Sequence, residues 1–251
     1  MNTLHLAHHN HITIAKLSRG VTNAINLELV NELAGTLQKV KDDSDIRGLV
    51  LSSANEKFFS IGLDIPQLFE LSREDFAFFY QKFNHVCLDL FTLSKPTVAA
   101  ITGHAIAGGC ILALCCDYRF MAEGRKFMGL NEIKLGVPVP YPADCILRHL
   151  VGIRIARDVM DTGEFYQSEK LLQIGIVDEV LPIEKVLAKS IEKAGSLSAS
   201  SPEAFALIKR NRVEIIWTEI LARLEEKEQF FVERWYSPEA RERLKEAMEK
   251  F

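Results

Sequence analysis

The stretch "GHAIAGGCILALCCDY", residues 103–118, begins with glycines and continues as an apolar run that no charged side chain interrupts before Asp117. Gly108 and Gly109 precede Cys110–Cys116, which has the length and composition of a buried helix. Glycines at a helix entrance let a ligand approach free N–H groups, which favour an anion or a developing oxyanion. Close packing of the helix is the alternative. The stretch is thus a candidate for a site whose hydrogen-bond donors come from the backbone.

Strand and helix patterns alternate on both sides of this stretch. The strand patterns cover His11–Leu17, Ile46–Ser52, Thr97–Ile101 and Tyr118–Ala122, and the helical patterns cover Asn26–Val40 and about Pro66–Leu93. Strands that alternate with helices favour an α/β fold with crossover connections.

The C-terminal part is helical in pattern from Ile183 to Phe251, with Pro182, Pro202 and Pro238 as breaks. Its apolar face is larger than a peripheral layer needs for itself, so it covers the protein's own core or packs on another subunit. The apolar residues are Phe205, Leu207, Ile208, Ile215, Ile216, Ile220, Leu221, Leu224, Phe230 and Phe231.

The overall composition is that of a soluble globular protein, with 48% hydrophobic and 25% charged residues in a chain of 251. A net charge of -4 argues against a nucleic-acid partner, and no apolar run is long enough to predict a membrane span. The five cysteines lie mostly in apolar runs without zinc-type spacing, so we expect reduced core residues, no metal site and a cytoplasmic location.

A second glycine turn lies in "FFSIGLDI", residues 58–65. The turn at Gly62 can present the Leu63 N–H toward the first glycine pair, and two convergent backbone donors form an oxyanion hole. Asp64 suits a capping role for the helix that follows, because its carboxylate accepts bonds from free N–H groups.

These two stretches, followed by "GLNEIKLGVPVP" at residues 129–140, resemble the successive motifs of the crotonase, or enoyl-CoA hydratase/isomerase, superfamily. The resemblance implies a spiral of ββα units with two nearly perpendicular sheets, and C-terminal helices that form trimers or hexamers. It implies a core of residues 1–190 with an acyl-CoA site and an oligomerisation region of residues 191–251. It implies no cofactor beyond the coenzyme A of the substrate.

The resemblance also implies the site residues. The thioester oxygen is accepted by the N–H groups of Leu63 and Gly108, and Glu132 is the catalytic acid or base. The implied substrate-binding residues are Ile61, Gly62, Leu63, Asp64, Ile65, Gly108, Ile111 and Asn131.

One departure from the family pattern points to a branch. Family hydratases carry two glutamates, and the first of these positions is Ile111, which cannot transfer a proton. A single carboxylate is sufficient for a 1,3-proton shift, and the sequence is most similar to the Δ3,Δ2-enoyl-CoA isomerase branch. We therefore expect Glu132 to shuttle the proton, with an apolar wall that excludes water and raises its pKa.

Two alternatives remain open. Another acyl-CoA reaction, such as hydration, hydrolysis or decarboxylation, requires a second polar residue at the thioester, for which Tyr141 and Asp144 are candidates. The second alternative is a noncatalytic protein that binds acyl-CoA. Lys57 and Arg19 are candidate partners for the phosphates of coenzyme A. Phe230 or Phe231 is a candidate for the wall of the coenzyme A site. His104 is a candidate to bond a backbone carbonyl.

Overall fold

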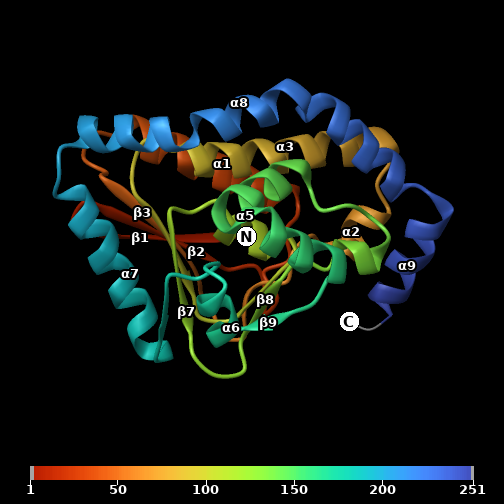
Figure 1. The fold of residues 1–251 in the computed structure, drawn as a ribbon, viewed down its shortest axis with the longest axis horizontal. Helices are drawn as coiled ribbons and strands as arrows, with labels where there is room; N and C mark the ends of the chain where they lie inside the picture. Colours follow the sequence, from red (N-terminus) through yellow and green to blue (C-terminus); the bar gives the residue numbers. More distant parts are fainter. Residues whose placement is uncertain (1–2, 250–251) are drawn as a thin grey trace.

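The computed structural model describes residues 3–249 and places their strands in two sheets (Figure 1). The larger sheet contains, in spatial order, β1 (Leu4–His9), β2 (Ile12–Leu17), β3 (Gly48–Ser53), β5 (Thr97–Ile101), β7 (Tyr118–Ala122) and β10 (Glu179–Leu181). β1 and β2 are antiparallel, and the remaining neighbours in this sheet are parallel. Parallel neighbours require crossover connections, which confirms the α/β prediction.

The smaller sheet contains β4 (Phe58–Ser60), β6 (His104–Ile106), β8 (Phe127–Gly129) and β9 (Tyr166–Gln167). Its strands β4, β6 and β8 each follow a strand of the larger sheet, namely β3, β5 and β7, and each is followed by helical structure. This repeated order is the predicted ββα unit. The short strands have no sequence pattern of their own, because three residues are too few to show an alternation.

The helices follow the predicted order with changes at their ends. They are α1 (Leu27–Asp42), α2 (Ile65–Phe69), α3 (Arg73–Thr92), α4 (Gly108–Leu114), the 3₁₀ helix η1 (Glu132–Leu135), α5 (Tyr141–Thr162), α6 (Ser168–Gln173), α7 (Ile183–Ser198), α8 (Pro202–Trp235) and α9 (Pro238–Met248). The helical region predicted from Pro66 to Leu93 is two helices, because Ser72 caps a new helix by accepting a bond from the Asp75 N–H.

The long helix α8 runs along one side of the molecule over α3, from α7 at one end to α9 at the other (Figure 1). Helix α7 packs on strands β3, β5 and β7 of the larger sheet. The predicted boundary at residues 190 and 191 falls within α7. Residues 1, 2, 250 and 251 of the two predicted regions lie outside the described residues.

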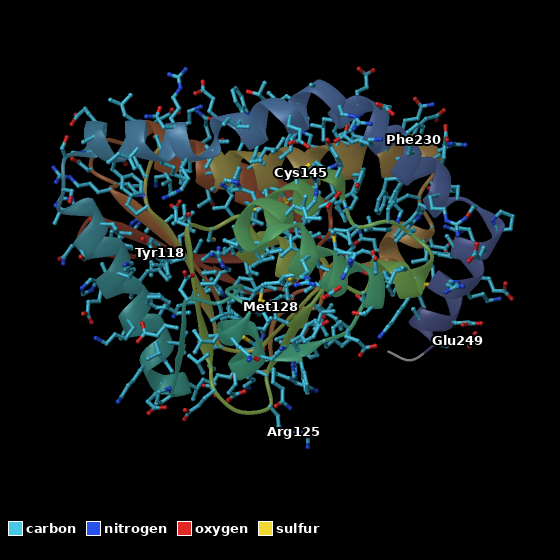
Figure 2. All side chains as sticks on the ribbon, in the orientation of Figure 1. Tyr118, Arg125, Met128, Cys145, Phe230 and Glu249 are labelled. Carbon is cyan, nitrogen blue, oxygen red and sulfur yellow. The ribbon has the colours of Figure 1, made fainter. Side chains whose placement is uncertain are left out.

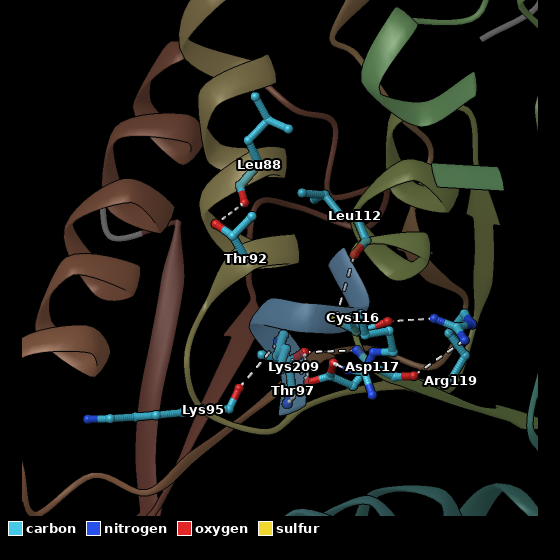
Figure 3. A network of polar contacts seen from close by, with 10 residues as sticks. Leu88, Thr92, Lys95, Thr97, Leu112, Cys116, Asp117, Arg119 and Lys209 are labelled. Atoms are coloured by element: carbon cyan, nitrogen blue, oxygen red, sulfur yellow. Dashed lines mark hydrogen bonds and ion pairs between the residues drawn. The ribbon is translucent and has the colours of Figure 1, made fainter. Parts of the chain in front are cut away.

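A buried ion pair fastens the first half of α8 to the sheet (Figure 3). The Lys209 side chain is 1% exposed, and its ammonium lies 2.8 Å from the carboxylate of Asp117, which also accepts bonds from the Thr97 N–H and hydroxyl. Arg212 contacts the same carboxylate. A buried charge requires such a partner, so this contact holds Lys209 of α8 beside Asp117, which is itself bonded to the first residue of β5.

Only part of the apolar face of α8 packs on the protein's own core. Ile220, Leu224 and Phe231 are buried, whereas Leu207, Ile208, Ile215, Leu221 and Phe230 are exposed. Figure 2 labels Phe230 on this helix. Within residues 3–249, no helix combines the length and apolar character that a membrane crossing requires.

Candidate active site

A cavity of about 470 Å³ lies where the segments that follow β4, β6 and β8 meet the ends of α8 and α9. Its wall is mainly apolar. The apolar lining residues include Ile61, Leu63, Ile65, Phe83, Ile106, Ile111, Leu135, Val137, Phe231 and Trp235. A concave apolar site with a few polar groups is the usual form of a small-molecule site in a protein.

Two glycine turns touch beside this cavity, which Leu63 and Gly108 line. Gly62 has a φ of +99°, and a Cβ atom placed on it would lie 2.9 Å from the Gly108 nitrogen. A Cβ atom on Gly108 would lie 3.3 Å from the Gly62 Cα and 3.4 Å from the Leu63 nitrogen. Glycine is needed at position 62 because of its positive φ and the close Gly108 backbone, and a side chain at position 108 would be tightly packed.

The Leu63 N–H points away from its neighbouring strand segment. The Gly62 carbonyl accepts a bond from the Ile25 N–H at 2.7 Å, and the Asp64 N–H donates to the Ile25 carbonyl at 2.9 Å. The N–H between these two therefore faces the opposite side, toward Gly108. Among the described residues, neither the Leu63 N–H nor the Gly108 N–H donates a recorded hydrogen bond, so both can bind an oxygen atom of a ligand.

The residue before Gly108 has a strained backbone. Ala107 has a φ of 46° and a ψ of -117°, a conformation that L-residues rarely adopt. Its N–H donates to the Gly129 carbonyl at 2.9 Å, which fixes the turn against the segment that carries Glu132. Strain of this kind persists only where the surrounding structure imposes it, and it is frequent at functional sites.

Glu132 lies in the cavity wall at the first residue of η1 and is 5% exposed. Burial raises the pKa of its carboxyl to about 7, because the charged form loses its hydration. Its Oε2 atom and the Oδ1 atom of the neighbouring Asn131 are buried without a hydrogen-bond partner among the described residues. A carboxyl with such a pKa can both take and return a proton near neutral pH.

Most of the predicted site residues line the cavity. They are Ile61, Leu63, Ile65, Gly108, Ile111, Asn131 and Glu132. Gly62 and Asp64 do not line it. The Asp64 side chain accepts a bond from the Gln67 N–H at 3.2 Å and pairs with Arg19 at 2.6 Å, so it caps α2.

The other candidate residues have local partners. Asp144 pairs with Arg148 at 2.9 Å, and neither Tyr141 nor Asp144 lines the cavity. The Nδ1 atom of His104 accepts a bond from the Phe127 N–H at 3.1 Å, so its bonded partner among the described residues is an N–H and not the carbonyl that was the candidate. His104 lies at the cavity wall as an acceptor of that backbone bond.

Several lining residues have no signal in the sequence. Phe83 and Trp235 contribute to the wall from α3 and α8, and Arg243 contributes from α9. Their spacing indicates helical faces, but which face meets the cavity depends on how the helices pack. Among residues 3–249, no group of three or more His, Cys, Asp or Glu side chains is placed to hold a metal ion.

Comparison with known proteins agrees with this geometry. The model of the enoyl-CoA hydratase/isomerase family matches residues 7–251. Enoyl-CoA delta isomerase 1, mitochondrial, of Mus musculus is 34% identical over 180 residues, which are 71% of this chain and 62% of that protein. The human protein of the same name is 32% identical over 79% of this chain and 66% of its own length. The chain thus spans somewhat less than two thirds of the length of these relatives.

A hydratase is also among the relatives. The short-chain-enoyl-CoA hydratase of Clostridium acetobutylicum is 28% identical over 84% of this chain and 80% of that protein. Among solved structures, human mitochondrial delta3-delta2-enoyl-CoA isomerase has a TM-score of 0.95 and 27% identity, with 99% of this chain and 97% of that chain covered. The family match over nearly the whole chain, together with the agreement in fold, shows that this protein belongs to the crotonase, or enoyl-CoA hydratase/isomerase, superfamily.

Proposed function

We propose that the protein converts 3-enoyl-CoA to 2-enoyl-CoA by a 1,3-proton shift at a single glutamate. The observation that carries the proposal is the distribution of carboxylates around the cavity. Among the described lining residues the carboxylates are Glu132 and Glu246, and Glu246 is exposed on α9. Ile111 stands at the position where family hydratases carry their first glutamate, and it is 2% exposed.

The proposed reaction uses the two backbone donors and one carboxylate. Glu132 removes a proton from C2, and the electron pair of that C–H bond delocalises onto the thioester oxygen. The N–H groups of Leu63 and Gly108 stabilise the negative charge on this oxygen as an oxyanion hole. Glu132 then returns its proton to C4, and the double bond moves into conjugation with the thioester.

The wall around Glu132 supports isomerisation over hydration. Ile111 and its apolar neighbours exclude water from the conjugated product, and burial holds the pKa of Glu132 at about 7. A carboxyl with that pKa is a stronger base than an exposed glutamate and still a usable acid.

Hydration is the second candidate, because hydratases are similar to this chain at 28% to 30% identity. It requires a second proton carrier, and Glu246 is the other carboxylate of the described lining. Three further parts of the proposal are independent of the reaction: coenzyme A as the acyl carrier, a homotrimer or a dimer of trimers, and a cytoplasmic location. The mouse and human relatives are mitochondrial by name, so localisation of the tagged protein in its own cell tests the last part.

The first experiment mixes the purified protein with a 3-enoyl-CoA and, separately, with a 2-enoyl-CoA. Absorbance of the conjugated thioester and the product mass are followed for the wild type, Glu132→Gln and Glu246→Gln. We expect a 2-enoyl product without mass gain, lowered by about 10² to 10⁴ in Glu132→Gln because the proton carrier is lost. Glu246→Gln should keep the isomerase activity.

Other outcomes assign the activity differently. A product heavier by one water, lost in both variants, would show a hydratase with Glu246 as its second carrier. Binding of an acyl-CoA without any product would show the noncatalytic alternative.

A further inference from the structure

Arg234 joins the end of α8 to the turn that carries Glu132. Its Nε–H donates to the carbonyl oxygen of Gly136 at 2.6 Å. Gly136 ends the 3₁₀ helix η1, and the next N–H, that of Val137, donates to the Glu132 carbonyl at 3.1 Å. The Arg234 guanidinium therefore holds Gly136, the residue that ends the 3₁₀ helix beginning at Glu132.

Helix α9 packs directly on the same glycine. Gly136 has a φ of +75°, and a Cβ atom placed on it would lie 3.3 Å from the Ala240 Cα and 3.0 Å from the Arg243 Cδ. Glu239, in the first turn of α9, pairs with the outer nitrogen of Arg234. Arg234 thus bonds to α9 through Glu239 and to the end of η1 through Gly136.

The corner between α8 and α9 is also fixed on its opposite side. The Tyr236 hydroxyl donates to the Leu71 and Ser72 carbonyls at 2.8 and 2.9 Å, and Arg241 donates to the Phe69 carbonyl at 2.9 Å. These contacts attach the corner to the last residue of α2 and to the loop between α2 and α3. Because these bonds fix the corner between α8 and α9, Arg234 holds η1 from a part of the structure that is itself held in place.

The Glu132 carboxyl depends on such support. Its Oε2 atom has no hydrogen-bond partner among the described residues, so none of their side chains orients this atom through a hydrogen bond. Its position follows from the backbone of η1. A reacting group must be held within a fraction of an ångström of its productive position, and a displacement of about 1 Å can lower the rate about 100-fold.

We propose that Arg234 is a positioning residue for Glu132, acting through its bond to the Gly136 carbonyl. The role rests on the proposed function, in which Glu132 transfers the proton. Phe231 and Trp235 lie beside Arg234 on α8 and line the cavity, so one helical turn both forms the wall and supports the base.

The test compares Arg234→Gln, Arg234→Lys and the control Arg157→Gln. Arg157 lies on α5, is paired with Asp158 and is exposed on the surface, outside the cavity lining. With a 3-enoyl-CoA we expect kcat of Arg234→Gln to fall about 10- to 100-fold, with KM within about threefold of the wild type, because binding is retained and alignment is lost. Lysine can donate to the same carbonyl, so Arg234→Lys should recover part of the lost kcat.

Three results overturn the assignment: an unchanged kcat, a KM that rises as much as kcat falls, or a lysine variant no more active than the glutamine variant. Circular dichroism confirms that each variant is folded before the rates are compared.

A second measurement does not depend on the reaction. Amide hydrogen exchange followed by mass spectrometry should show faster exchange at the Val137 N–H in Arg234→Gln than in Arg157→Gln. A wild type without isomerase activity would contradict the proposed function, while equal exchange in the two variants would contradict the mechanical role of Arg234.

Discussion

Burial of the Glu132 carboxyl acts on both the chemistry and the stability of the protein. The side chain is 5% exposed, and the loss of hydration disfavours its charged form. The raised pKa makes the group a better base in its ionised state. The same shift makes the ionised state a cost to folding, since the unfolded chain ionises this group with an ordinary pKa.

The pH dependence of the rate follows from this pKa. The base must be ionised to remove the C2 proton, so kcat/KM should rise about tenfold per pH unit below about pH 7 and level off above it. Initial rates with a 3-enoyl-CoA between pH 5 and 9, at about 0.5-unit intervals, measure this limb. A rate that is nearly constant from pH 5 upward would show that Glu132 keeps the ordinary glutamate pKa of 4.5 and is hydrated in solution.

The pH dependence of stability has the opposite sign. A folded pKa raised from 4.5 to about 7 stabilises the protein fully below the unfolded value, and this stabilisation is lost as pH rises through the folded value. Glu132→Gln is neutral at every pH, so its free energy of unfolding should exceed that of the wild type by up to about 3 kcal/mol at pH 8 and match it near pH 4.5.

Urea unfolding of both proteins at the two pH values measures this difference. Glu246→Gln is the control, because an exposed carboxylate carries no such burial cost. An equal gain in the control, or no gain at pH 8, would contradict the burial of the Glu132 charge.

At the scale of elements, α4 and β4 meet through a glycine that has no space for a methyl group. A Cβ atom on Gly109 would lie 2.3 Å from the Ser60 carbonyl oxygen, a backbone atom that cannot move without moving β4. This contact brings the start of α4 close to the segment that leads to Leu63. The second glycine of the pair therefore serves close packing, while the first lines the cavity.

Two alanine substitutions compare a glycine that has no space for a methyl group with a glycine that has space for one. Gly109→Ala should lower the free energy of unfolding by about 1 to 3 kcal/mol through overpacking, and should lower kcat because the two donor segments move apart. Gly35→Ala should raise the free energy of unfolding by about 0.4 to 1 kcal/mol, because Gly35 lies within α1 with nothing inside 4 Å of its Cβ position. Denaturant unfolding and steady-state rates measure both variants, and a tolerated Gly109→Ala would contradict the contact.

At the scale of the whole molecule, α8 exposes several apolar side chains. The side chains of Leu207, Ile208 and Ile215 are 60%, 64% and 77% exposed. Isolated apolar side chains are normal on a surface, whereas several on one helix favour a subunit interface. The predicted trimer gives this face a partner.

The oligomeric state can be tested by one substitution on this face. Light scattering after size-exclusion chromatography should give the wild type the mass of three or six 28.3 kDa subunits. Ile215→Asp should shift the mass toward one subunit, because a buried unpaired carboxylate destabilises an interface. Ile153→Asp, on α5 with a similar exposure of 72%, is the control. A monomeric wild type would contradict the predicted oligomer.

Local signals in the sequence were sufficient for much of the fold. Strands β5 and β7 have their predicted bounds, and the prolines that mark the breaks stand at the starts of the last three helices: α7 follows Pro182, α8 begins at Pro202 and α9 begins at Pro238. These features depend on short-range periodicity and on the fixed φ of proline, which need no tertiary contact. The resemblance to a family placed Glu132, Leu63 and Gly108 in one site, and spacing along the chain could not have done so.

Other features depend on contacts between distant segments. Strands β4, β6 and β8 are too short for a periodic pattern and exist because they pair with one another. The wall residues Phe83 and Trp235, the support from Arg234 and the raised pKa of Glu132 all arise where segments far apart in the chain pack together. Amino-acid order thus specifies which residues can form a helix, a strand or a turn, whereas burial and proximity are properties of the packed molecule and exist only once these elements have come together.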